Sequence, residues 1–146
     1  MYKVEEQLNG FKLLLGDNVI LNHTSDSPCI YIGRGTESFS EYRGNYDVSD
    51  YIEERIPLTF AKLSQHNIEF FRFEQDEKPA LVISLTGQGV GTDGLSLGFE
   101  PMISGYNRFW LRIAADQDDR IYGLGEQMSY FNLRGRNFPV LTSEPG

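Results

Sequence analysis

Two carboxylates near the end of the chain, Glu126 and Glu144, stand in the stretch whose residue types come closest to those of an enzyme site. Residues 120–146 read RIYGLGEQMSYFNLRGRNFPVLTSEPG. Carboxyl groups about 5 Å apart can hydrolyse a glycosidic bond with retention, one as nucleophile and the other as acid/base. The same residues can instead pair with Arg134 and Arg136, and such networks are commoner in loops than catalytic pairs. The residues favour the structural pairing and leave the catalytic one open.

The shape of this stretch is set by its turn-forming residues. Gly123 and Gly125 bracket Leu124 directly after the strand-like residues 121–122, where glycine allows a sharp turn without a Cβ clash. We therefore expect an ordered loop rather than a core strand. The residues expected to structure it are Gly123, Gly125, Glu126, Arg134 and Arg136.

Other residues that could do chemistry lack the neighbours they would need. His23 and His66 are far apart in sequence and have no cysteine or carboxylate cluster beside them, so we predict no metal site and a surface or strand-end position for both. Cys29 has no basic neighbour to lower its pKa, which predicts a small buried thiol. The glycine-rich residues 87–91 lack the following helix or Lys-Ser/Thr pair of a phosphate loop and suit a hairpin connection, so no cofactor is expected.

Length and charge narrow the class of protein. The chain has 146 residues, about one domain, and a net charge of -8 from 21 acidic and 13 basic residues. The basic residues form no block, so nucleic acid and anionic membranes are poor partners. The start of the chain lacks the pattern of a signal peptide, a single cysteine forms no internal disulfide, and no run of about 18 apolar residues occurs. We therefore predict a soluble, cytoplasmic protein.

Short apolar runs separated by turn signals predict an all-β fold. Residues 42–46 suit a loop or irregular edge strand, and residues 48–55 suit either one or two helical turns, capped by Ser49 or Asp50, or a continuing strand. Roughly eight to ten short strands and hardly any helix are typical of an antiparallel β-sandwich. The clearest predicted strands are residues 11–15, 19–21, 29–32, 56–63, 68–73, 80–86, 95–99 and 109–113.

Several motifs together resemble a known family. They are IYGLGEQ at residues 121–127, SYFNLRGR at 129–136, FPVLTSEPG at 138–146, SPCIYIGRG at 27–35 and YRGNY at 42–46. Taken in their order along the chain, they resemble the N-terminal region of glycoside hydrolase family 31, the α-glucosidase and α-xylosidase family, and most of all its bacterial sulfoquinovosidase-like branch. The resemblance covers most of the chain and is most specific at residues 121–136. Leu141 departs from it, because that branch is expected to have Trp there.

The resemblance implies a fold for this chain and a location for the catalytic residues of the whole enzyme. In that family the N-terminal part is a β-sandwich of galactose-mutarotase-like type, and the two catalytic aspartates lie on a later (β/α)8 barrel. A barrel needs about 250 residues, so this chain cannot contain one. The resemblance thus implies that residues 1–146 are a single, truncated N-terminal sandwich domain without catalytic residues. Glu144 matches the acidic position that touches sugar hydroxyls, and it is the one substrate-binding residue expected here.

Three functions follow as hypotheses. The first is a non-catalytic domain of an α-glycosidase, with the α-glycoside and the enzyme's own barrel as partners and with self-association through exposed sheet edges. The second is a free-standing carbohydrate-binding module that uses Tyr130 or Trp110 as a sugar platform. The third, a complete small glycosidase, requires Glu126 and Glu144 to lie within about 5.5 Å, or about 9.5 Å for inversion.

Overall fold

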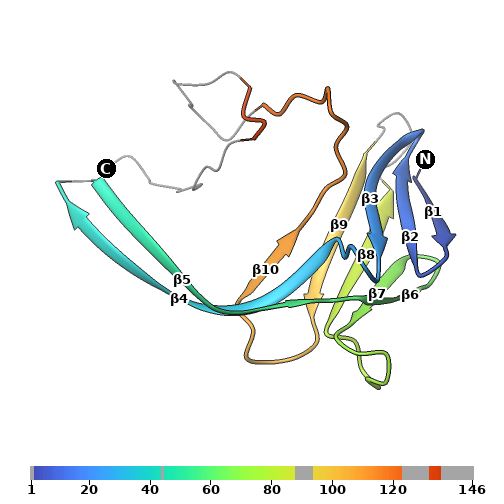
Figure 1. Ribbon diagram of the computed structural model, residues 1–146, viewed down its shortest axis with the longest axis horizontal. Coiled ribbons are helices and arrows are strands. Elements are labelled where there is room, and N and C mark those ends of the chain that lie inside the picture. The colour runs from blue at the N-terminus through green and yellow to red at the C-terminus, as the bar shows by residue number, and fades with distance from the viewer. Residues whose placement is uncertain (1, 44, 88–93, 123–131, 136–146) are drawn as a thin grey trace. The chain divides into compact units, whose positions relative to one another are not determined.

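The computed structural model describes residues 2–43, 45–87, 94–122 and 132–135, and these residues form ten strands and no helix (Figure 1). All strand pairs are antiparallel. The predicted all-β, antiparallel fold class is confirmed. The strands are β1 (Tyr2–Gln7), β2 (Gly10–Leu15), β3 (Asn18–Thr24), β4 (Ile30–Tyr42), β5 (Asn45–Pro57), β6 (Phe60–Leu63), β7 (Asn67–Phe71), β8 (Leu81–Gly87), β9 (Leu95–Pro101) and β10 (Arg108–Leu111).

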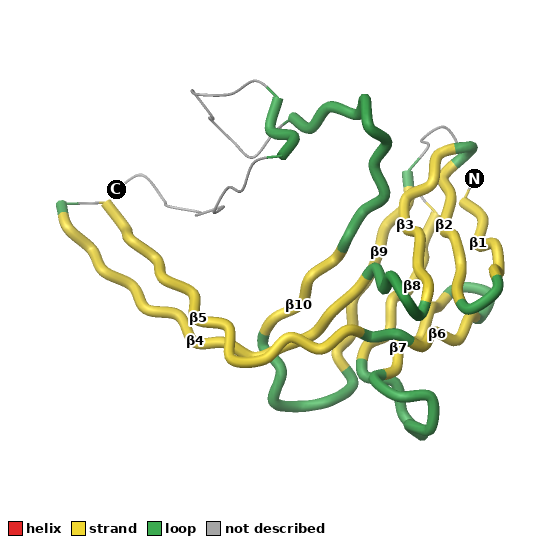
Figure 2. Tube along the Cα trace, viewed as in Figure 1, coloured by secondary structure: helices red, strands yellow, loops and turns green. Residues whose placement is uncertain are grey.

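The strands form three sheets around one hydrophobic core, which makes the fold a β-sandwich. Their strand orders are β1-β2-β3, β10-β4-β5 and β6-β7-β8-β9 (Figure 2). Alternate side chains of each sheet turn inward, as the period of a half-buried strand requires. The rings of Phe11 on β2 and Phe70 on β7 lie 6.0 Å apart and join two of the sheets. The core consists of Phe11, Leu13, Leu21, Cys29, Ile30, Ile32, Leu58, Ile68, Phe70, Ala80, Leu81, Ile83 and Leu85.

The long β4–β5 hairpin corrects two of the expected elements. Residues 48–55 lie within β5, so the helical alternative is wrong and the strand alternative is right. The reason is that β4 offers them a ladder partner along its whole length, from Tyr31 opposite Pro57 to Tyr42 opposite Asn45. Residues 42–46, expected to be a loop or irregular edge strand, span the end of β4, the turn and the start of β5, and Arg43 has a φ of 53°.

The predicted strand at residues 56–63 is also corrected, because the chain changes sheets there. Ile56 and Pro57 end β5, whereas Phe60 begins β6 in a different sheet. Proline has no N–H to donate to a ladder, and the next N–H, that of Leu58, donates to the carbonyl of Ile30 at 3.1 Å. A single apolar run therefore serves two sheets, with the fully buried Leu58 at the junction.

The far half of the hairpin has no third strand. The partners of β10 are only residues 30–33 of β4, so beyond Gly35 the strands β4 and β5 pair with each other alone among the described residues (Figure 1). The side chains of residues 36–43 and 49–51 on this two-stranded arm are exposed, including Phe39 and Tyr51. We call residues 36–51 the hairpin arm.

The chain divides into two compact units, Met1–Ala114 and Ala115–Gly146. All ten strands belong to the first unit, which holds the core and both of the clefts described below. The described residues include no helix that is long and apolar enough to cross a membrane.

Candidate functional site

The loop that the sequence singled out falls mostly outside the described residues. Arg134 is the member of the predicted set that the structure describes. The distance between the two carboxylates, which would decide the glycosidase hypothesis, therefore stays untested. The predicted site residues outside the described ranges are Gly123, Gly125, Glu126, Arg136 and Glu144.

Arg134 and Asn132 hold two parts of the second unit together. The Asn132 Oδ1 accepts hydrogen bonds from the main-chain N–H groups of Ile121 and Arg134, each at 3.1 Å. The Arg134 guanidinium donates to the main-chain carbonyl of Asp119 at 3.0 Å. This contact is with a carbonyl, and the carboxylates expected as partners of Arg134, Glu126 and Glu144, lie outside the described residues. Asn132 was not among the predicted residues, although asparagine side chains often bond nearby main-chain groups in turns.

His23 lies at the centre of the sandwich rather than at its surface. The sequence predicted a surface or strand-end position for this residue. The strand-end position is confirmed, because His23 is the last residue but one of β3. The surface position is wrong, because the side chain is fully buried. Its ring stacks on Phe11 at 5.2 Å and meets the edge of Phe70 at 5.4 Å. Nε2 donates to the carbonyl of Thr59, and Nδ1 accepts from the N–H of Cys29. Burial lowers the pKa of His23, against a smaller raising effect of the Thr59 hydrogen bond.

Cys29 is buried, as predicted. Burial raises the pKa of its thiol to about 12, so the reactive thiolate does not form near neutral pH.

A first cleft, of about 560 Å³, opens beside His23 between the β1–β2 turn and β6. We call it the acidic cleft, because its lining residues include two carboxylates, Glu6 and Glu74, and only one ammonium group, that of Lys62. Its hydroxyl, amide and carboxylate groups can exchange hydrogen bonds with a neutral polar ligand. The polar lining residues are Glu6, Gln7, Asn9, His23, Ser25, Thr59, Lys62 and Glu74.

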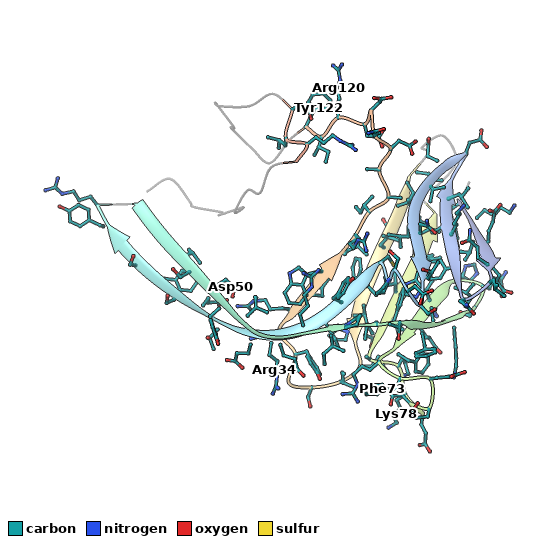
Figure 3. The ribbon with its side chains drawn as sticks, in the orientation of Figure 1. Arg34, Asp50, Phe73, Lys78, Arg120 and Tyr122 are labelled. Carbon is teal, nitrogen blue, oxygen red and sulfur yellow. The ribbon has the colours of Figure 1, made fainter. Side chains whose placement is uncertain are left out.

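A second cleft, of about 480 Å³, lies between the base of the β4–β5 hairpin, the end of β7 and the β9–β10 loop. We call it the arginine pocket, because Arg34 and Arg72 both line it (Arg34 is labelled in Figure 3). Arg34 pairs with Glu54 at 2.9 Å, and its guanidinium lies 6.0 Å from the centre of the Tyr106 ring. The remaining lining residues are Met102, Ile103, Ser104 and Gly105.

Trp110, a predicted sugar platform, is partly covered. The guanidinium of Arg55 lies 4.8 Å from the centre of the Trp110 ring and 4.3 Å from that of Tyr31, in cation–π geometry. The indole also lies so close to Gly33 that a Cβ there would come within 2.8 Å of it. Trp110 therefore braces the β10-β4-β5 sheet. Tyr130, the other predicted platform, lies outside the described residues.

Comparison with known proteins finds relatives over nearly the whole chain. No family model matches it. It is 38% identical to a sulfoquinovosidase of Agrobacterium fabrum (strain C58) over 142 residues, and this match covers 97% of this chain and 20% of that protein. It is 40% identical to a sulfoquinovosidase of Escherichia coli (strain K12) in an alignment of 149 positions, which covers 99% of this chain and 21% of that protein. A solved GH31 sulfoquinovosidase from E. rectale, in complex with an aza-sugar inhibitor, superimposes with a TM-score of 0.76 at 39% identity, covering 99% of this chain.

The chain is homologous to the N-terminal region of glycoside hydrolase family 31 enzymes. The resemblance drawn from residues 121–146 and the earlier motifs is thereby confirmed, including its sulfoquinovosidase-like branch. The chain spans about a fifth of the length of the family 31 relatives it matches.

Proposed function

We propose that this chain is the non-catalytic sandwich domain of a family 31 α-glycosidase that acts on sulfoquinovosides. Identity of 38–40% over nearly the whole chain, but over only a fifth of each relative, is the observation that carries the proposal. The chain is too short for a barrel of about 250 residues, so the catalytic carboxylates belong elsewhere in the whole enzyme. That enzyme cleaves a terminal α-glycosidic bond with retention, and its sandwich packs on the barrel. The chain has a single cysteine and so forms no internal disulfide, which agrees with a cytoplasmic enzyme.

Within this domain, Glu144 is the proposed contact with the sugar. The support comes from the motif FPVLTSEPG, which ends two residues after Glu144 and matches the position at which family 31 domains reach the sugar site. A carboxylate accepts hydrogen bonds from sugar hydroxyls, which can donate as well as accept. Glu144 is therefore a binding residue and takes no part in bond cleavage.

The test is Glu144→Gln in the full-length enzyme, assayed on an aryl α-sulfoquinovoside. A lost hydrogen bond to a charged group lowers kcat/KM by roughly tenfold to a hundredfold, with a raised KM. The control is Glu77→Gln, which removes an exposed carboxylate of the β7–β8 connection and should leave kcat/KM unchanged. If kcat/KM is the same for Glu144→Gln and the unmodified enzyme, Glu144 does not contact the sugar.

The non-catalytic role has its own test in the isolated chain. It should not hydrolyse any aryl α-glycoside, because both catalytic groups are absent from it. Hydrolysis that Glu126→Gln abolishes would show instead that this chain is a complete small glycosidase.

A second candidate, a free-standing carbohydrate-binding module, is favoured by the acidic cleft. Its amide, carboxylate and hydroxyl side chains suit the hydroxyls of a neutral sugar. Calorimetric titration of the isolated chain with glucosides, xylosides and sulfoquinovosides separates the two candidates. A domain that forms a sugar site only together with its barrel gives no binding heat, whereas a binding module gives saturable heat that Glu74→Gln reduces.

A further inference from the structure

Arg72 carries the one buried side-chain nitrogen or oxygen atom without a hydrogen-bond partner among the described residues, its Nε. The nearest carboxylate oxygen, Asp76 Oδ2, lies 3.7 Å away, which is too far for a hydrogen bond. That oxygen already accepts the main-chain N–H of Phe73 at 3.2 Å. A buried, unsatisfied N–H of a charged group is costly, so the acceptors of the protein do not fully satisfy the Arg72 guanidinium, which is itself one-third exposed.

A second guanidinium, that of Arg34, lines the same pocket. Its Nε donates to Glu54 Oε2 at 3.1 Å, and one Nη lies 2.9 Å from the same oxygen in an ion pair. No hydrogen bond of the other Nη is found within the described part of the chain, which leaves a donor for a ligand. Glu54 is the one carboxylate among the lining residues, and its charge is already balanced by Arg34.

The shape of the pocket limits the size of its ligand. The β9–β10 loop lines one side of the pocket with Ser104 and Gly105, and nothing lies within 4 Å of the position where a Gly105 side chain would begin. The volume of about 480 Å³ admits a small solute. The planar donor fork of a guanidinium matches the oxygens of carboxylate, sulfate and phosphate groups better than it matches a spherical ion.

We propose that the arginine pocket binds a small oxyanion between Arg34 and Arg72. The oxyanion group accepts N–H groups of the Arg72 guanidinium that lines the pocket and the Nη donor of Arg34. The charged lining residues are two arginines and one carboxylate, Glu54, so a single oxyanion group balances the excess positive charge of the lining.

The test uses the full 146-residue chain, titrated with inorganic phosphate, sulfate, methanesulfonate and acetate and followed by the chemical shifts of its main-chain amides. Chloride at equal ionic strength controls for screening. The expected result is saturable binding of oxyanions, with shifts at residues 102–106, and weaker, non-saturable effects of chloride. The order of affinities distinguishes a carboxylate site from a phosphate or sulfonate site.

Matched variants locate the binding. Arg72→Gln and Arg34→Gln each remove donors from the pocket and should weaken binding about tenfold or more. Lys3→Gln removes the same single charge from an exposed ion pair with Glu5 on β1 and should leave the affinity unchanged. The side chain of Arg34 is 54% exposed, so Arg34→Gln should leave folding intact. It therefore tests the site even if Arg72→Gln disturbs folding.

Two results would overturn the proposal. One is the absence of saturable binding for all four oxyanions. The other is binding by Arg34→Gln that equals binding by the unmodified chain and by Lys3→Gln.

Discussion

His23 is suited to its position only in its neutral form. One ring nitrogen donates to Thr59 and the other accepts from Cys29, so both are satisfied without a charge. Protonation would place a second N–H against the N–H of Cys29 inside a core of aromatic rings. The imidazole therefore resists protonation, which agrees with its lowered pKa.

This predicts that stability falls as the pH falls below about 6.5, the usual pKa of histidine in an unfolded chain. The pKa of folded His23 is lower, so the unfolded state binds more protons between the two values. The contribution of His23 is complete above about pH 6.5 and is lost as the pH falls toward the folded pKa. Urea unfolding at several pH values measures it.

Variants isolate this effect from the titration of carboxylates. His23→Gln should flatten the pH slope of the unfolding free energy in that window. His66→Gln, which changes an exposed histidine, should keep the slope. A slope in His23→Gln that equals that of the unmodified chain would contradict the assignment.

At the scale of elements, β10 positions the hairpin arm through side chains rather than through its ladder. Its strand pairing reaches only Gly33, but the Asn107 side chain donates to the carbonyl of Gly35 at 2.9 Å and accepts its N–H at 3.0 Å. Arg108 then bonds Glu37 on β4 and Asp50 on β5, which face each other across the hairpin. These charges also raise the pKa of Arg108, chiefly through the hydrogen bond with Asp50.

We therefore predict that Arg108→Ala loosens the arm and little else. Amide hydrogen exchange in the hairpin arm, residues 36–51, should become about two- to tenfold faster, which is the scale of exposed ion pairs. Exchange in β1, β2 and β3 should not change. Lys3→Ala, which breaks the exposed Lys3–Glu5 pair on β1, is the control, and unchanged exchange in the arm of Arg108→Ala would refute the role of Arg108.

At the scale of the whole first unit, one core is shared by all three sheets. Phe11 and Phe70 connect β2 with β7, while Ile30 and Leu58 bring in the β4–β5 hairpin. Burial of this many apolar side chains is the main source of stability for a sandwich, since each buried side chain contributes about 1.5–3 kcal/mol. Loss of a central residue should therefore destabilise all the sheets together.

Phe70→Ala should lower the free energy of unfolding by about 3–5 kcal/mol, because the ring is fully buried and its removal leaves a cavity. The matched control is Phe39→Ala on the hairpin arm, where the ring is 66% exposed and the expected change is within about 0.5 kcal/mol. Urea unfolding measures both, and similar losses in the two variants would contradict a core centred on Phe70.

The apolar runs of the sequence predicted most strands of the sandwich, because alternation and turn-forming residues act over a few neighbours. β8 and β9 followed from the alternation of residues 81–85 and from the hairpin signal before Leu95. The same local signals misplaced the junction at Pro57, where one apolar run passes between two sheets. They also left residues 48–55 ambiguous, since their strand form depends on a partner in β4.

By itself, the sequence determined the all-β class, the buried Cys29 and, through its motifs, the family 31 resemblance. Tertiary structure alone decided that His23 lies inside the core, that Arg55 covers Trp110 and that Arg34 and Arg72 share a pocket. The physical reason is distance along the chain: a strand forms from the properties of adjacent residues. The environment of a histidine or an arginine instead depends on partners many residues away, which only the packing of the sheets brings together.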